Sequence, residues 1–167
     1  MADPSRLLFI HGLQGSSRGF KATLLRQHFP GMVIPDFAGD FWQRMAQLEQ
    51  VIGDTAGWTI VGSSLGGLMA AVFACRHPQQ VDRLILLAPA LAFLDLDQHP
   101  LPPYPGPVTI YHGRMDDVVP LDRTQDVAEQ LFPNLAFHVV DATHDLNAFV
   151  QTLDWSALVE GAAEPSR

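Results

Sequence analysis

The sequence predicts an α/β fold with an open, mostly parallel sheet of about six strands that is flanked by helices. Short apolar segments without polar alternation recur along the chain, and segments with helical spacing of apolar residues lie between them. Short apolar runs of this kind are typical of strands that are buried on both faces, as in a parallel sheet. Strands that alternate with helices along one chain indicate an α/β architecture.

Four segments carry the strand pattern most clearly, and each of them ends near Gly, Pro or His. They are residues 7–10, 59–61, 84–87 and 108–111. Two weaker segments, residues 32–34 and 135–140, bring the expected sheet to about six strands, which is a common size.

The helical pattern is clearest after the second of these strands, where apolar residues keep the i, i+3, i+4, i+7 spacing of one helix face. This face holds Leu65, Leu68, Met69, Val72 and Phe73. Further helices are expected at residues 20–28, 41–52, 121–132 and 146–158. Asp40 stands where a cap of the helix at 41–52 belongs, and Gln43 completes the pattern of a capping box.

The length and composition predict one domain across residues 1–167. A chain of 167 residues of which 47% are hydrophobic buries roughly two thirds of its unfolded surface around one core. No internal repeat or linker divides the sequence. Residues 161–167 are small and polar, so we expect them to fray.

The charge distribution argues against nucleic acid or an anionic membrane as a partner. The formal net charge is −8, and the ten Lys and Arg residues form no basic run. The polar first six residues and the short apolar run after them do not form a signal peptide, so a cytoplasmic location is expected. The lone Cys75 offers neither an intrachain disulfide nor a thiolate zinc cluster, and no motif for a metal, nucleotide or flavin cofactor is present.

A G-x-S-x-G sequence, formed by Gly62, Ser64 and Gly66, lies where the second clear strand turns into the following helix. This is the pattern of a nucleophile elbow, in which a strained turn lifts the serine above the sheet. Ser63 fits the pattern less well because Val61, not glycine, precedes it by two residues. The alternative is an ordinary Ser/Gly turn with either serine as a helix cap.

Together with two other blocks, this elbow resembles the corresponding blocks of minimal α/β hydrolases, similar to the small YqiA-like esterases that lack a cap domain. The first block is Phe-Ile-His-Gly-Leu-Gln-Gly-Ser at residues 9–16, and the third is His-Gly-Arg-Met-Asp-Asp-Val-Val-Pro at residues 112–120. The resemblance covers residues 7–153. It implies that the chain cleaves carboxylic esters or thioesters of small molecules through an acyl-enzyme on Ser64, without a cofactor.

The resemblance also implies an acid and a base in the order Ser, acid, His. Asp116 and Asp117 both follow a late strand, and the family pattern favours Asp116 by its position in the block. Among seven histidines, His144 follows both Ser64 and the acid on a loop between a strand and a helix. We therefore expect a triad of Ser64, Asp116 and His144.

Two backbone N–H groups, of Leu13 and Leu65, are the expected oxyanion hole, because this fold uses the residue after the nucleophile and one from the loop after an early strand. Gln14 is a further candidate whose side-chain direction the sequence leaves open. A cap would be inserted in residues 88–107, which at twenty residues are too few for a cap domain. Within them Leu91, Phe93 and Leu94 are candidates for a pocket wall, with ordinary packing as the alternative.

Other functions stay open on this fold. A serine at the elbow argues against dehalogenases and epoxide hydrolases, which carry aspartate there. A lyase or carbon–carbon hydrolase keeps the serine. The alternative outside catalysis is a ligand-binding or signalling module that retains the triad residues.

Overall fold

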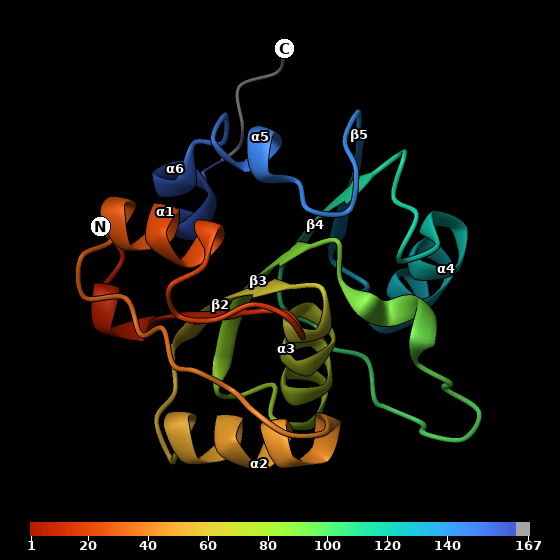
Figure 1. The fold of residues 1–167 in the computed structure, drawn as a ribbon. Helices are drawn as coiled ribbons and strands as arrows, with labels where there is room; N and C mark the ends of the chain where they lie inside the picture. The colour runs from red at the N-terminus through yellow and green to blue at the C-terminus, as the bar shows by residue number, and fades with distance from the viewer. Residues whose placement is uncertain (163–167) are drawn as a thin grey trace.

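The computed structural model describes residues 1–162 and has a parallel five-stranded sheet between two layers of helices (Figure 1). The strands lie across the sheet in the order β1-β2-β3-β4-β5, and all neighbours run parallel. The strands are β1 (Leu7–Ile10), β2 (Trp58–Ser63), β3 (Val81–Leu87), β4 (Val108–Gly113) and β5 (Leu135–Val140). The helices are α1 (Phe20–His28), α2 (Phe41–Ile52), α3 (Leu65–Arg76), α4 (Leu121–Leu131), α5 (Asn147–Val150) and α6 (Trp155–Glu160), with 3-10 helices η1 (Pro4–Arg6) and η2 (Ala90–Phe93). The predicted α/β fold class is confirmed.

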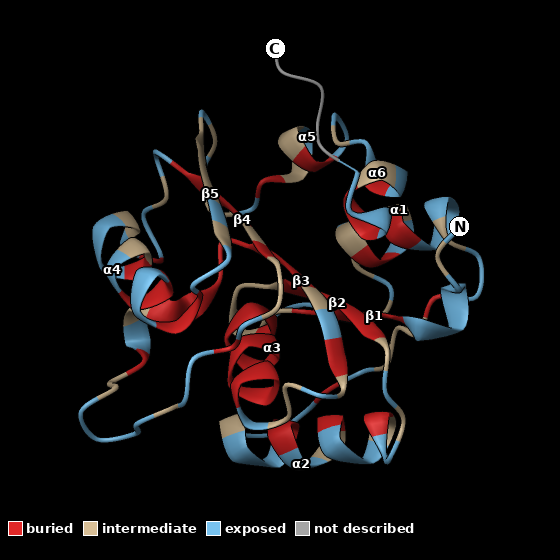
Figure 2. Cartoon of the chain, turned by 180° about the vertical axis from the view of Figure 1, so that it is seen from behind, coloured by how far each residue is buried: buried red, intermediate tan, exposed pale blue. Residues whose placement is uncertain are grey.

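Two hydrophobic clusters fill the spaces on the two faces of the sheet. Leu8 and Ile10 of β1 belong to the cluster on the face that α2, α3 and α4 cover. Leu7 and Phe9 of the same strand point the other way and pack with α1, α5 and α6. This alternation follows from the two-residue period of a strand, and Figure 2 shows the inner strands and α3 as mostly buried. Both faces are covered, which explains why the strands read as unbroken apolar runs.

The sheet has five strands and not six, so the prediction of a strand at residues 32–34 was wrong. Val33 makes a single parallel bridge to Leu8, with its N–H donating to Leu7 O and its C=O accepting from Phe9 N–H. Pro35 follows two residues later and has no N–H to extend the ladder. The segment therefore contacts the open edge of β1 at one residue only.

The single helix expected at residues 146–158 is two short helices, α5 and α6. The chain leaves α5 in a turn, and the Asp154 side chain accepts a hydrogen bond from Ala157 N–H to cap a new helix. Aspartate favours such a cap over a helix interior, which accounts for the break. Of the tail that was expected to fray, Gly161 and Ala162 are described and residues 163–167 lie outside the described residues.

The other helices agree with the sequence to within one residue. The capping box at the start of α2 is present, with Asp40 and Gln43 each bonded to the other's backbone N–H. Within residues 88–107 the only regular element is η2, and a coil with five prolines follows it, so no cap domain is inserted there. In the part of the chain that is described, none of the helices has the length and apolar content needed to cross a membrane.

The first turn of α3 lies directly against the end of β1. A Cβ added at Gly66 would stand 2.1 Å from the Ile10 carbonyl oxygen, and one at Gly62 would stand 2.6 Å from the Gly66 carbonyl oxygen. Both obstacles are backbone atoms, so no side-chain movement can relieve the clash. Only glycine at both positions lets strand, turn and helix approach this closely.

We expect Gly66→Ala to lower the free energy of unfolding by about 3 kcal/mol, because the added methyl group forces β1 and α3 apart. Gly19→Ala is the matched control, since a Cβ there would meet its nearest atom at 3.4 Å and its φ is −69°. That change should cost less than about 1 kcal/mol. Urea unfolding followed by circular dichroism measures both, and equal losses would show that the close approach is not the constraint.

Candidate active site

Ser64 occupies the turn between β2 and α3 in a conformation that L-amino acids rarely adopt. Its φ is 54° and its ψ is −115°, and such a backbone costs of order 1–3 kcal/mol. Hydrogen bonds from the neighbouring strand hold it in place, with Ser64 N–H donating to Leu87 O at 3.0 Å and Ala90 N–H donating to Ser64 O at 2.9 Å. The turn therefore has the geometry that the G-x-S-x-G sequence predicts.

The structure brings together the three predicted triad residues from three separate loops. Ser64 Oγ lies 2.9 Å from His144 Nε2, and His144 Nδ1 lies 2.8 Å from Asp116 Oδ2. With the proton on Nδ1, the ring donates to the carboxylate and leaves Nε2 as the acceptor of the serine proton. Ser64 and His144 are 80 residues apart in the chain, so the fold alone creates this contact.

The Asp116 carboxylate is buried and fully supplied with partners. Its second oxygen, Oδ1, accepts from the backbone N–H groups of Val118 at 2.9 Å and Val119 at 2.8 Å. Burial by itself would raise the pKa of Asp116, but the hydrogen bonds from Val119, His144 and Val118 outweigh it and hold the pKa below its ordinary value. The group is therefore a carboxylate at neutral pH.

The geometry distinguishes Asp116 from Asp117 and Ser64 from Ser63, the two choices that the sequence left open. Asp117 is exposed on the same loop, whereas the Asp116 side chain has no exposed surface and contacts His144. Ser63 is the last residue of β2 and Ser64 is the one that reaches His144. Asp116 and Ser64 are thus the residues placed to act.

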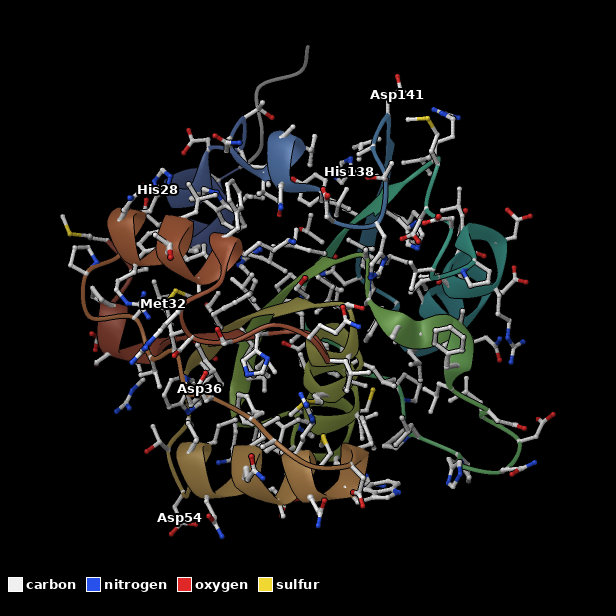
Figure 3. All side chains as sticks on the ribbon, in the orientation of Figure 1. His28, Met32, Asp36, Asp54, His138 and Asp141 are labelled. Carbon is white, nitrogen blue, oxygen red and sulfur yellow. The ribbon has the colours of Figure 1, made fainter. Side chains whose placement is uncertain are left out.

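The loops that carry Asp116 and His144 are packed on one another. A Cβ at Gly113 would lie 2.3 Å from the Ala142 carbonyl oxygen, and Met115 N–H donates to that oxygen at 3.1 Å. At the exposed end, Arg114 Nε donates to Asp141 at 3.0 Å, and Figure 3 shows Asp141 at the tip of the loop after β5. These contacts fix the separation between the acid and the base.

The two expected oxyanion donors lie beside the serine and are free. Neither Leu13 N–H nor Leu65 N–H donates a hydrogen bond to any other residue in the described chain. Gly12 brings the first loop close, because a Cβ on it would lie only 3.3 Å from Ser64 Cβ. Both N–H groups belong to residues that line the same cavity as Ser64.

His11 orients one of these donors, a role that the sequence analysis did not assign. Its Nδ1 lies 2.7 Å from Gly12 O, and its Nε2 accepts from Phe37 N–H at 2.9 Å. The Nε2 contact sets the tautomer with the proton on Nδ1, so the ring donates to Gly12 O. That carbonyl and the Leu13 N–H belong to one peptide group, and fixing the carbonyl therefore fixes the donor.

Arg44 of α2 supports the same loop from behind. It is 5% exposed, its Nε donates to Gly39 O at 2.9 Å and its Nη2 donates to Leu13 O at 3.4 Å. Its Nη1 is buried without a hydrogen-bond partner in the described residues. Position 44 lies on the apolar face of α2 with Met45 and Leu48, but an arginine is seldom buried, so its charge argued against this contact.

A cavity of about 680 Å³ opens above Ser64. Gln14 and Phe93 line it as expected, together with Leu13 and Phe20. Leu91 and Leu94 do not line it, so their assignment to a pocket wall was wrong. They are buried in the cluster with α3 and α4, because η2 turns one side toward those helices, whereas Ala90 and Phe93 line the opening.

This fold and site define the class of the protein: it has an α/β-hydrolase fold with a nucleophile elbow. The solved structure of alpha/beta hydrolase domain-containing protein 10 from mouse is similar, with a TM-score of 0.78, 18% identity, and 94% of this chain and 90% of that chain covered. Est1E from Butyrivibrio proteoclasticus, solved with ferulic acid bound, has a TM-score of 0.69, 17% identity, and 93% and 86% covered. At these identities the likeness shows the fold.

Within this class the chain belongs to the uncharacterised protein family UPF0227, whose model matches residues 6–103. The match includes Ser64 and ends before Asp116 and His144. The chain is also 33% identical over 108 residues to the biotin biosynthesis bifunctional protein BioHC of Teredinibacter turnerae. That match covers 56% of this chain and 19% of the relative's length, so it relates this chain to a small part of a larger protein. Together with the fold, these findings support a hydrolase.

The lowered pKa of Asp116 predicts a pH-dependent contribution to stability. The pKa of an aspartate in an unfolded chain is about 3.9, and the pKa of Asp116 in the folded protein lies below that value. The carboxylate therefore stabilises the fold above the unfolded pKa, and this contribution is lost as the pH falls through the folded pKa. We expect the stability difference between wild type and Asp116→Asn to shrink from pH 5 downward in urea unfolding. A difference that stays constant down to the acid transition would contradict this.

Proposed function

We propose that this protein is a serine hydrolase that cleaves carboxylic esters or thioesters through an acyl-enzyme on Ser64. The observation that carries the proposal is the continuous hydrogen-bonded path from Ser64 Oγ through His144 to the buried Asp116 carboxylate. A serine on a strained elbow at the floor of an open cavity, with an imidazole in contact, is the arrangement that nucleophilic acyl transfer requires.

In the first half of the reaction, Ser64 Oγ forms a bond to the acyl carbon while His144 Nε2 takes its proton. Asp116 keeps the ring in the productive tautomer and stabilises the imidazolium that forms. The carbonyl oxygen becomes negative and accepts hydrogen bonds from Leu13 N–H and Leu65 N–H. His144 then gives its proton to the leaving oxygen or sulfur as the bond to the acyl carbon breaks.

In the second half, water attacks the acyl-enzyme. His144 takes a proton from the water as its oxygen bonds to the acyl carbon, and the same two N–H groups receive the new negative charge. When the tetrahedral adduct collapses, the proton returns to Ser64 Oγ and the carboxylic acid leaves. The donors are preorganised because His11 and Arg44 hold the loop before the substrate arrives.

The substrate is a small molecule, because the cavity of about 680 Å³ has the size of a small-molecule site. Short η2 and the proline-containing coil after it leave the opening uncovered by a domain. Four large apolar side chains, of Leu13, Phe20, Phe93 and Val118, line the cavity and are each at least 46% exposed. They offer apolar surface to the substrate at the rim of the cavity.

Ser64→Ala should abolish labelling by a fluorophosphonate probe and lower kcat for a simple ester by on the order of 10⁶. Ser63→Ala is the matched control, since it removes the neighbouring hydroxyl and leaves the path to His144 in place. Mass spectrometry of the labelled peptide and a 4-nitrophenyl butyrate assay measure the two effects. Labelling of Ser64 without turnover of any ester or thioester would favour a lyase or a ligand-binding module.

Asp116→Asn should lower kcat by on the order of 10⁴, because an amide in place of the carboxylate favours the wrong tautomer of His144. Asp117→Asn makes the same chemical change one residue away at an exposed carboxylate, and we expect it to change kcat less than threefold, of the order of a weak surface electrostatic effect. Steady-state kinetics of both variants with one ester give the comparison. A larger loss from Asp117→Asn would overturn the assignment of the acid.

A further inference from the structure

Lys21 places an ammonium group at the cavity above Ser64 that the hydrolytic steps do not use. Lys21 is the only lysine in the sequence. It is the second residue of α1 and lines the cavity together with Ser64 and His144. A cation in the first turn of a helix lies at the positive end of the helix dipole, so helix stability does not account for its position.

The surroundings of Lys21 leave hydrogen-bond donors available. Its Nζ donates to Asn147 Oδ1 at 3.2 Å, and an ammonium group has two further donors. Gly19 gives α1 no side-chain cap, and the N–H groups of Phe20, Lys21 and Ala22 donate to no residue in the described chain. All of these residues line the cavity. The wall therefore presents several donors, and the nearest acceptor to the Lys21 ammonium is the Asn147 oxygen.

Charge on this wall is limited by one carboxylate. Burial lowers the pKa of Lys21, and the nearby Asp145 opposes that shift by favouring the charged ammonium. Asp145 also lines the cavity, and its own Oδ1 accepts from Asn147 N–H at 2.9 Å. A negatively charged ligand would be attracted by the Lys21 ammonium and repelled by Asp145, so its charge has to lie closer to Lys21 than to Asp145.

The position of this wall relates it to one half of the substrate. His144 Nε2 must reach the leaving oxygen or sulfur to protonate it, so the leaving group lies beside His144. Asp145 and Asn147 lie one and three residues after His144 in the chain, and Lys21 is hydrogen-bonded to Asn147. Phe93 and Val118, which come from η2 and from the loop after β4, supply apolar surface from other elements. The polar wall thus belongs to the leaving-group side.

We propose that Lys21 and Asn147 form a subsite for a single carboxylate on the alcohol or thiol half of the substrate. The subsite rests on the proposed function, since the leaving-group side is defined by proton transfer from His144. It deepens that function by making the preferred substrates esters or thioesters whose released alcohol or thiol is itself an acid. Lys21 acts on specificity by attracting and orienting this group.

The subsite can be tested without turnover by the binding of two phenols of nearly equal shape, each of which stands for a released leaving group. The probes are 4-hydroxyphenylacetate and its neutral amide, 4-hydroxyphenylacetamide, and ligand-observed NMR measures their affinities. We expect the carboxylate to bind about tenfold more tightly to the wild type, and this preference to disappear in Lys21→Gln. Arg18→Gln is the control, because it removes the same charge from an exposed side chain three residues away that does not line the cavity.

The preference should persist in Arg18→Gln. Equal affinities of the two probes for the wild type, or a preference that survives in Lys21→Gln, would overturn the subsite whether or not Ser64 proves to be catalytic. Failure of the wild type to react with a fluorophosphonate probe would instead count against the proposed function. The two failures are therefore distinguishable.

Turnover then locates the carboxylate. The butanoyl esters of the two probes differ in leaving-group charge, and the methylene group keeps their phenol reactivities similar. The ratio of kcat/KM for the anionic ester to that for the neutral ester should fall about tenfold in Lys21→Gln and be restored in Lys21→Arg. A third ester, the succinyl half-ester of 4-hydroxyphenylacetamide, carries the carboxylate on the acyl side. If Lys21→Gln lowers only the kcat/KM for that ester, the leaving-group assignment is wrong.

Discussion

The contact between the first turn of α3 and the end of β1 leaves no space for a side chain at Gly66. The same approach brings the loop after β1 within contact of Ser64 and forces the serine into a positive-φ turn. A looser junction would move Leu13 N–H away from Leu65 N–H, and the proposed oxyanion site requires both donors at one oxygen. The strain at Ser64 is tolerated because Leu87 and Ala90 of the neighbouring segment hold its backbone.

A second constraint acts on the other side of the serine, where the loop after β4 packs on the loop after β5. Met115 N–H donates to the Ala142 carbonyl oxygen, and Gly113 leaves room for that oxygen. Asp116 and His144 are therefore held by one packed unit, and Ser64, Leu13 and Leu65 by another. Each unit is preorganised by backbone contacts before substrate binds. Side-chain flexibility contributes little to the geometry, since Asp116 is completely buried and His144 is bonded at both ring nitrogens.

The parts that the sequence could predict are those encoded locally. The alternation of apolar strands and helices, the capping box at Asp40 and the elbow at Ser64 each occupy a few consecutive residues. The spacing of the residues in the third block favoured Asp116 over Asp117 as the acid, although only the fold shows which carboxylate is buried.

The roles of His11, Arg44 and Lys21 could not be predicted, because they depend on partners that are distant in the chain or on backbone atoms. These partners are Phe37 N–H, Leu13 O and the Asn147 side chain. The split at Asp154 and the single bridge at Val33 arise from competition between local hydrogen bonds and regular structure, which periodicity does not resolve.

The two hydrophobic clusters lie on opposite faces of the sheet, and candidate catalytic residues lie next to members of both. Ser64 precedes a helix anchored in one cluster, whereas His144 precedes Leu146, which is anchored in the other. Loosening of either side by a fraction of an ångström would lengthen the bond between Ser64 and His144 while most secondary structure persisted. The contact between Ser64 and His144 therefore depends on the packing of both halves. If the proposed function holds, a local expansion of the interior would abolish activity before the secondary structure is lost.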